Sequence, residues 1–166
     1  MGQANGLGGV VQYDLGRSLE EGRFVRTGTL NSPPPILGTA VAGLRGDAQL
    51  NGYRIEELVD KLIAKYPKAG FNRPKEDKLY TSKHAGRDCS NCIGIVREQR
   101  EPMVYYGLVG SANRVLEDST FRDNLRQELN ILCFEMEAGG LMNDFPTLVI
   151  RGICGKSCTM VLAANV

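Results

Sequence analysis

Two glutamates in the last third of the chain are the residues best placed for chemistry. Glu135 and Glu137 stand in Phe134-Glu135-Met136-Glu137-Ala138, which is typical of a short strand that turns into a helix. Further along, Leu148-Val149-Ile150 is a continuous apolar run that predicts a buried strand of a parallel sheet. Polar groups leaving two such strands meet at one edge of an α/β sheet, where ligands bind. Glu137 then has two interpretations, a carboxylate of a ligand site or a first-turn glutamate stabilised by the helix dipole, and the residues alone favour the second.

A second group of residues has the types that bind zinc or carry out redox chemistry. His84 precedes Cys89 and Cys92, which are spaced Cys-x-x-Cys. These residues supply only three ligands, and the spacing does not select a fourth among the other cysteines, which are Cys133, Cys154 and Cys158. A structural zinc site, a redox pair and free thiols in a loop all remain open. His84 is the single histidine, and no Gly-x-Ser-x-Gly motif accompanies it as in serine hydrolases.

A third segment places polar groups after a predicted strand. Met103 to Gly110 predicts one strand, and Ser111 and Asn113 follow it in a turn. Arg151 ends the predicted strand around Val149, and a buried arginine needs an anionic partner such as Glu135.

These segments together resemble the superfamily of nucleoside phosphorylases and methylthioadenosine/adenosylhomocysteine nucleosidases. The family pattern is Glu-Met-Glu-(Ala/Gly), a short helix, and an apolar strand ending in Arg-(Gly/Ala)-Ile-(Ser/Cys)-Asp. Residues 107–116 are similar to its Gly-Leu-Ile-x-Ser-Gly-(Asp/Asn)-x-(Phe/Val)-(Ile/Leu). The resemblance is closest to the fungal branch, whose members often carry ankyrin-type repeats after this domain. It implies an α/β fold with a mixed sheet flanked by helices.

The resemblance also implies roles for individual residues. Glu137 would hold the ribose hydroxyls, and Met136 would pack under the sugar. Val115 would lie on the face of the purine, and Leu116 would offer backbone groups to its edge. The full implied substrate-binding set is Ser111, Asn113, Val115, Leu116, Glu135, Met136 and Glu137, with Ser111 and Asn113 shaping the turn and Glu135 mainly structural.

The chain departs from the family pattern at the position of the catalytic acid. Gly155 stands where the family has the aspartate that protonates the leaving base. The expected family activity is cleavage of a purine nucleoside by phosphate or water, and here we expect it to be impaired. The rival expectation is a module that binds a nucleoside, or a vestigial one, without turnover. Phosphate would be a co-substrate of a phosphorylase, and no other cofactor is implied.

The composition bears on the partners that the protein can bind and on the cellular compartment in which it is found. The chain has 166 residues and a net charge of +1, so no strong field attracts nucleic acid or an anionic membrane. No apolar run approaches the roughly 18 to 20 residues that span a bilayer. Five cysteines are an odd number, which favours a reducing compartment over a disulfide framework. We expect a cytoplasmic protein. Formation of a homo-oligomer stays open, because the expected fold leaves apolar surface uncovered.

The remaining elements are expected from local patterns. Residues 9–14 and 24–27 predict a strand pair around a polar turn. Ser32 and the prolines after it predict a helix that ends near Gly46, and 53–66 predict an amphipathic helix. A short strand is expected at 93–96, and Asp118 predicts the cap of a helix that carries Phe121, Leu125 and Leu129.

The predicted organisation is one partial domain over residues 1–166. Within it, 68–92 form a long loop insertion and 155–166 an atypical tail that lacks the closing helix of the family. The resemblance leads us to expect a chain that is truncated at both ends.

Overall fold

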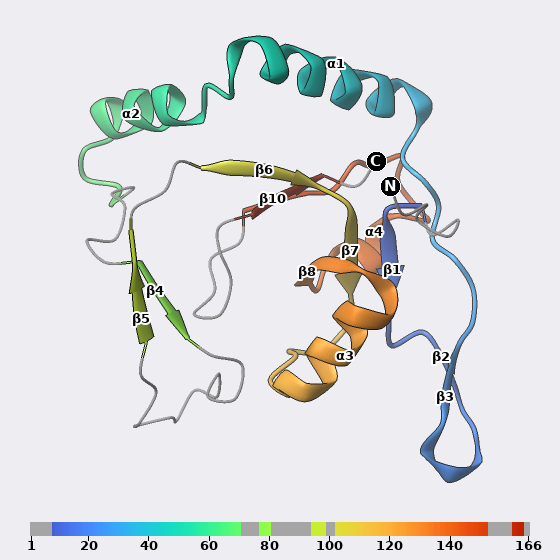
Figure 1. Ribbon diagram of the computed structural model, residues 1–166. Helices are drawn as coiled ribbons and strands as arrows, with labels where there is room; N and C mark the ends of the chain where they lie inside the picture. Colours follow the sequence, from blue (N-terminus) through green and yellow to red (C-terminus); the bar gives the residue numbers. More distant parts are fainter. Residues whose placement is uncertain (1–7, 71–76, 81–93, 99–101, 153–160, 165–166) are drawn as a thin grey trace.

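The computed structural model describes residues 8–70, 77–80, 94–98, 102–152 and 161–164. Its centre is a three-stranded parallel sheet in the order β1 (Val10–Gln12), β7 (Leu108–Ser111) and β8 (Ile131–Glu135) (Figure 1). Helix α3 (Ser119–Leu129) connects β7 to β8, which gives the crossover that parallel neighbours require. The expected α/β fold with a mixed sheet is confirmed, since parallel and antiparallel pairs both occur.

Two apolar clusters pack on the two faces of this sheet. Side chains of β1 and β7 alternate between them, and a register shift between β7 and β8 puts Ile131 and Cys133 in different clusters although they are two residues apart. One face carries Val10, Val109 and Cys133, which pack with Leu30, Ala138, Met142 and Val149 under helix α4 (Ala138–Leu141). The opposite face carries Val11, Tyr13, Leu108 and Ile131, which pack with Leu125 and other residues on the side of α3. Burial on both faces explains why Leu108 and Val109 are consecutive buried apolar residues.

Asp118 caps the N-terminus of α3, as the sequence predicts. Asp118 accepts hydrogen bonds at Oδ1 from the backbone N–H groups of Thr120 and Phe121, at 2.9 and 3.0 Å. These bonds satisfy two of the N–H groups that lack partners inside the first turn of a helix. Asn130 ends the helix in the left-handed conformation, with φ of 56°. The predicted helix with Phe121, Leu125 and Leu129 on its inner side is confirmed.

A second sheet is joined to the first at Gly107. The predicted strand from Met103 to Gly110 divides there into β6 (Met103–Tyr106) and β7. A Cβ at Gly107 would lie 2.6 Å from a methyl carbon of Leu132, so a larger residue there would force the Leu132 side chain to move. β6 pairs with β10 (Val161–Ala164), and β10 pairs with β9 (Ile150–Arg151). β10 lies inside the segment 155–166.

The predicted buried strand around Val149 needs correction. Only Ile150 and Arg151 form a strand, β9, and it pairs antiparallel with β10 rather than lying beside β8. Val149 is buried in the α4 cluster, whereas Ile150 is 61% exposed. The apolar run therefore contributes one buried residue to the core and does not form a central strand.

The N-terminal strand pairing also differs from the expectation. β3 (Phe24–Arg26) pairs antiparallel with β2 (Gly16–Ser18), in a hairpin that contains a short 3-10 turn at Glu20–Gly22. β1 instead pairs with β7. The expected pair of 9–14 with 24–27 is wrong: β1 ends at Gln12 and pairs with β7, whereas β3 pairs with β2, which falls between the two predicted strands.

Two helices follow the hairpin and form an arm above β6 (Figure 1). α1 (Pro35–Asn51) begins after Pro34 without a side-chain cap and runs through Gly46 to end at Gly52, so both predicted ends are corrected. Glycine inside a helix costs only about 1 kcal/mol relative to alanine, too little to stop it. α2 (Ile55–Lys65) confirms the predicted amphipathic helix. Among the described residues, no helix is long and apolar enough to cross a membrane.

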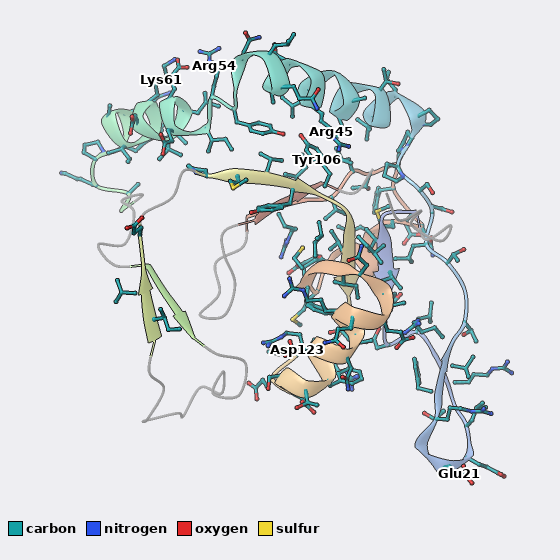
Figure 2. All side chains as sticks on the ribbon, in the orientation of Figure 1. Glu21, Arg45, Arg54, Lys61, Tyr106 and Asp123 are labelled. Atoms are coloured by element: carbon teal, nitrogen blue, oxygen red, sulfur yellow. The ribbon has the colours of Figure 1, made fainter. Side chains whose placement is uncertain are left out.

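The arm is fastened to β6 by a tyrosine pair. The hydroxyls of Tyr53 and Tyr106 lie 2.9 Å apart, and the Arg45 guanidinium lies 5.0 Å from the Tyr106 ring centroid (Figure 2). Burial and the bond from Tyr53 raise the pKa of Tyr106 to about 12.

A further hairpin lies partly within the predicted long loop. β4 (Asp77–Tyr80) pairs antiparallel with β5 (Gly94–Arg97). β5 confirms the short strand expected at 93–96. β4 falls inside 68–92, so that segment is not loop throughout; a four-residue strand is too short to show a sequence period.

Candidate functional site

The parallel sheet brings the ends of three strands to one edge. Gln12 of β1, Ser111 of β7 and Glu135 of β8 are aligned in register, with Ser111 between the other two. The backbone continues this alignment past the strands: Tyr13 N–H donates to the Ser111 carbonyl at 3.1 Å, and Ala112 N–H donates to the Glu135 carbonyl at 3.3 Å. The residues that follow the three strands therefore lie at the same carboxyl edge, where ligands bind in open α/β sheets.

Glu135 fixes the turn from β8 into α4. Its side chain is 7% exposed, and Oε2 accepts hydrogen bonds from the backbone N–H groups of Glu137 and Ala138, both at 2.9 Å. These are N–H groups that the start of a helix leaves without internal partners. The second oxygen, Oε1, is buried and has no hydrogen-bond partner within the described part of the chain. These contacts agree with the mainly structural role expected for Glu135.

Ser111 completes the support of the same turn. Its hydroxyl oxygen accepts a hydrogen bond from Gly139 N–H at 2.8 Å, and the residue is 1% exposed. Glycine at 139 permits this approach, since a Cβ there would lie 3.0 Å from Ser111 Oγ and 3.3 Å from the side chain of Gln12. The loop after β7 and the turn after β8 are thus bonded to each other.

Two neighbouring glycines allow a direct test of this packing. Gly139→Ala should lower the free energy of unfolding by about 1–3 kcal/mol, because the new methyl group pushes α4 away from Ser111. Gly140→Ala is the matched control, since a Cβ at Gly140 meets nothing within 4 Å. It should be neutral or stabilise by up to about 1 kcal/mol. Urea denaturation of both variants measures the difference; equal stabilities would contradict the close approach.

Glu137 projects from this supported turn. It stands at the N-cap of α4, and its side chain is 59% exposed. Arg151 Nη2 lies 2.8 Å from Glu137 Oε2, and Met136 N–H donates to the same oxygen at 3.3 Å. The partner suggested for Arg151 was Glu135; the structure corrects this to Glu137, because Glu135 points into the sheet edge and bonds backbone N–H groups. Both contacts of Glu137 use Oε2, so they fix the orientation of its carboxylate.

The loop after β7 is anchored from β1. Asn113 N–H donates to Asp14 Oδ2 at 2.9 Å, and Asp14 follows β1 as Glu137 follows β8. Further along the loop, Val115 is 58% exposed, and Leu116 packs against the cluster on the α3 face. Met136 is 43% exposed beside Glu137. The exposed members of the predicted set are therefore Met136, Glu137, Asn113 and Val115.

Tyr13 and Asp14 are part of this edge but were missed by sequence reasoning. The Tyr13 ring makes edge-on contacts with Phe121 and Phe134, at centroid distances of 6.4 and 5.6 Å. Burial raises the pKa of Tyr13; Arg114 opposes this shift, and Asp14 and Glu135 add to it. The second oxygen of Asp14, Oδ1, is buried without a partner among the described residues. The rule that selected Glu137, a carboxylate directly after a parallel strand, also applies to Asp14.

Several predicted residues lie outside the described residues. They are Gly155, His84, Cys89, Cys92, Cys154 and Cys158. Cys133 is described, and its side chain is buried in the α4 cluster. Within the described ranges, no group of three or more His, Cys, Asp or Glu residues is placed to hold a metal ion.

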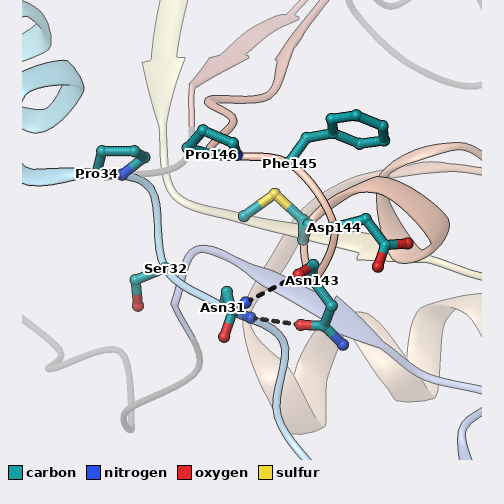
Figure 3. A pocket seen from close by; sticks show the side chains of 8 residues that line it. Asn31, Ser32, Pro34, Asn143, Asp144, Phe145 and Pro146 are labelled. Carbon is teal, nitrogen blue, oxygen red and sulfur yellow. Dashed lines mark hydrogen bonds between the residues drawn. The ribbon is translucent and has the colours of Figure 1, made fainter.

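A cavity of about 400 Å³ lies at the other end of α4 (Figure 3). The segment before α1 and the segment after α4 form it, and two bonds between Asn31 and Asn143 join these segments at 2.9 and 3.3 Å. Its lining residues are Asn31, Ser32, Pro34, Met142, Asn143, Asp144, Phe145 and Pro146. None of the site residues predicted from the sequence lines this cavity.

Comparison with known proteins gives one informative relative. The chain is 40% identical over 154 residues to a nucleotide-binding leucine-rich repeat (NLR)-like protein of the fungus Hyaloscypha variabilis. The match covers 89% of this chain and 15% of that protein, so the chain corresponds to a small part of its relative. No protein-family model matches the chain. No solved structure matches it either.

Proposed function

We propose that this chain binds a purine nucleoside at the carboxyl edge of β7 and β8. The observation that carries the proposal is the placement of Glu137: exposed, directly after β8, and on a turn bonded to Ser111 of β7. Vicinal ribose hydroxyls are two donors, and a carboxylate is an acceptor for both. The resemblance to nucleoside phosphorylases and nucleosidases supplies the ligand class.

The neighbouring residues suit this ligand. Arg151 Nη2 lies 2.8 Å from one Glu137 oxygen, which leaves the other oxygen to accept from the sugar. Met136 offers a half-exposed, polarizable side chain beside it, which suits the apolar face of a ribose. Asn113 and Val115 on the adjacent loop are exposed and can contact the base.

The chemistry proposed for this site is cleavage of the N-ribosyl bond, in an impaired form. A carboxylate at the ribose stabilises the positive charge that develops on the sugar. The departing purine also needs a proton, and Gly155 cannot donate one. Phosphate or water would be the attacking group, so phosphate is a co-substrate only for a phosphorylase.

Turnover should therefore be far below that of a working enzyme. General-acid protonation typically contributes about 10²–10⁴-fold, and we expect a deficit of that size relative to ordinary rates of about 1–10³ s⁻¹. The assay is release of adenine or hypoxanthine from methylthioadenosine, adenosine and inosine, with and without phosphate. Gly155→Asp is the matched variant and should raise the rate. Ordinary turnover by the unmodified chain would show that another group supplies the proton.

The second candidate is a recognition module without catalysis, acting in a larger cytoplasmic protein. It is favoured by the relative, in which the matching segment is a small part of a protein named as NLR-like. Such a module would bind the nucleoside and couple occupancy to the rest of the polypeptide. Equilibrium binding with no purine release distinguishes it from the impaired enzyme.

A further inference from the structure

Asp14 joins the segment after β1 to the loop after β7. Its Oδ2 accepts a hydrogen bond from Asn113 N–H at 2.9 Å, across 99 positions of the sequence. A hydrogen bond to a carboxylate is shorter and stronger than one between neutral groups. The bond therefore links two segments of the carboxyl edge that are far apart in the chain.

The backbone around Asp14 is held on both sides. Tyr13 N–H donates to the Ser111 carbonyl at 3.1 Å, and the Tyr13 side chain is buried in the cluster on the α3 face. Leu15 N–H donates to the Gln12 carbonyl at 3.4 Å, which closes a turn over residues 12–15. Asp14 thus projects from a fixed part of the fold, as a residue that positions a neighbouring loop must.

The carboxylate of Asp14 is turned into the edge rather than into water. Its second oxygen, Oδ1, is buried and has no hydrogen-bond partner within the described residues. A buried acceptor without a bond is unfavourable, so an aspartate on a surface turn normally keeps both oxygens hydrated. Stability alone does not explain this placement, which indicates a role in the site.

The loop bound by Asp14 carries the residues assigned to the base of the nucleoside. Ala112 N–H donates to the Glu135 carbonyl at 3.3 Å, and Asn113 is the next residue. Residues 113–118, all of them described, belong to no helix or strand, and Val115 among them is 58% exposed. The path of the loop past Ala112 therefore depends on contacts such as the bond to Asp14.

We propose that Asp14 is a positioning residue of the nucleoside site and gives it a preference for purines over pyrimidines. The inference rests on the proposed function, which assigns the base contacts to Asn113 and Val115. Through its bond to Asn113, Asp14 holds Val115 where its side chain lies against the face of the base. A purine offers a larger apolar face than a pyrimidine, so a fixed loop favours the purine and a moving loop loses this difference. Glu137 contacts the ribose, which both classes share.

The ratio of the affinities for adenosine and uridine, measured by isothermal titration calorimetry on the full chain, tests the preference. Asp14→Ala should lower this ratio by about 3- to 10-fold, which corresponds to one ordinary hydrogen bond. Asp14→Asn keeps an oxygen that accepts from Asn113 N–H and should restore most of the ratio. Glu137→Ala should weaken both nucleosides alike and leave the ratio unchanged, and Glu20→Ala, on the β2–β3 hairpin, should change neither affinity. A ratio near one in the unmodified chain, or an unchanged ratio in Asp14→Ala, would overturn the proposal.

Hydrogen exchange of the Asn113 amide tests the positioning without a ligand. In the isotopically labelled chain, this exchange should be at least about tenfold faster in Asp14→Ala and closer to the original rate in Asp14→Asn. The Val109 amide, which donates to the Gly9 carbonyl at 3.0 Å, should keep its rate if the sheet persists. Equal Asn113 exchange in all three chains would overturn the positioning role even if nucleosides bind. If the unmodified chain binds no nucleoside while Asn113 exchange still depends on Asp14, the proposed function is wrong, and the purine preference with it.

Discussion

Ile131→Ala should lower the free energy of unfolding by about 2–5 kcal/mol. Ile131 is 1% exposed at the start of β8, in the cluster that packs α3 on the parallel sheet. Removing three carbons there loses their burial and leaves a cavity that neighbouring strands cannot collapse into. This loss is a large fraction of the 5–15 kcal/mol that stabilises a typical domain.

Ile36→Ala is the matched control for this prediction. Ile36 lies in the first turn of α1 and is 77% exposed, so its truncation should change the stability by less than about 0.5 kcal/mol. Thermal and urea denaturation of both variants give the comparison. Similar losses from the two substitutions would show that the β1–β7–β8 sheet is not the stable centre of the protein.

The second large effect concerns ligand affinity. Glu137→Ala should weaken purine nucleoside binding by about 10- to 100-fold, which corresponds to the 1.5–3 kcal/mol of a hydrogen bond to a charged group. The fold should persist, because the Glu137–Arg151 pair is largely exposed and such pairs contribute little to stability. Isothermal titration calorimetry with adenosine and methylthioadenosine measures the change.

Two variants separate the role of Glu137 from a general loss of charge. Glu137→Gln keeps the size and one acceptor but removes the charge, so its affinity should lie between those of the alanine variant and the unmodified chain. Glu20→Ala, on the β2–β3 hairpin, removes a charge elsewhere and should bind as the unmodified chain does. If Glu20→Ala and Glu137→Ala weaken binding equally, the ribose role of Glu137 is wrong.

The sequence predicts best the elements whose signals are local. Asp118 caps α3 as expected, because its carboxylate and the N–H groups it binds lie within three residues of one another. The turn at Glu135 to Glu137 is also local, since the strand end and the start of α4 are adjacent. These two elements position most of the candidate site.

Features that depend on distant partners were not predictable in the same way. β1 pairs with β7, with Val10 opposite Val109, and no local pattern in the sequence indicates a pairing over that separation. The partner of Arg151 depends on how β9 joins β10 and on which glutamate faces outward. Asp14 follows a strand as Glu137 does, but its bond to Asn113 N–H joins residues 99 positions apart, and no local pattern indicates it.

The site itself is tested most directly by backbone NMR of the isotopically labelled chain titrated with a purine nucleoside. The account predicts the largest shifts at the amides of Ser111, Asn113, Met136 and Glu137, and their reduction in Glu137→Ala. Shifts centred instead on Asn31 and Asn143, around the cavity at the other end of α4, would place the ligand elsewhere and contradict the account, as would saturation without any shift at Glu137.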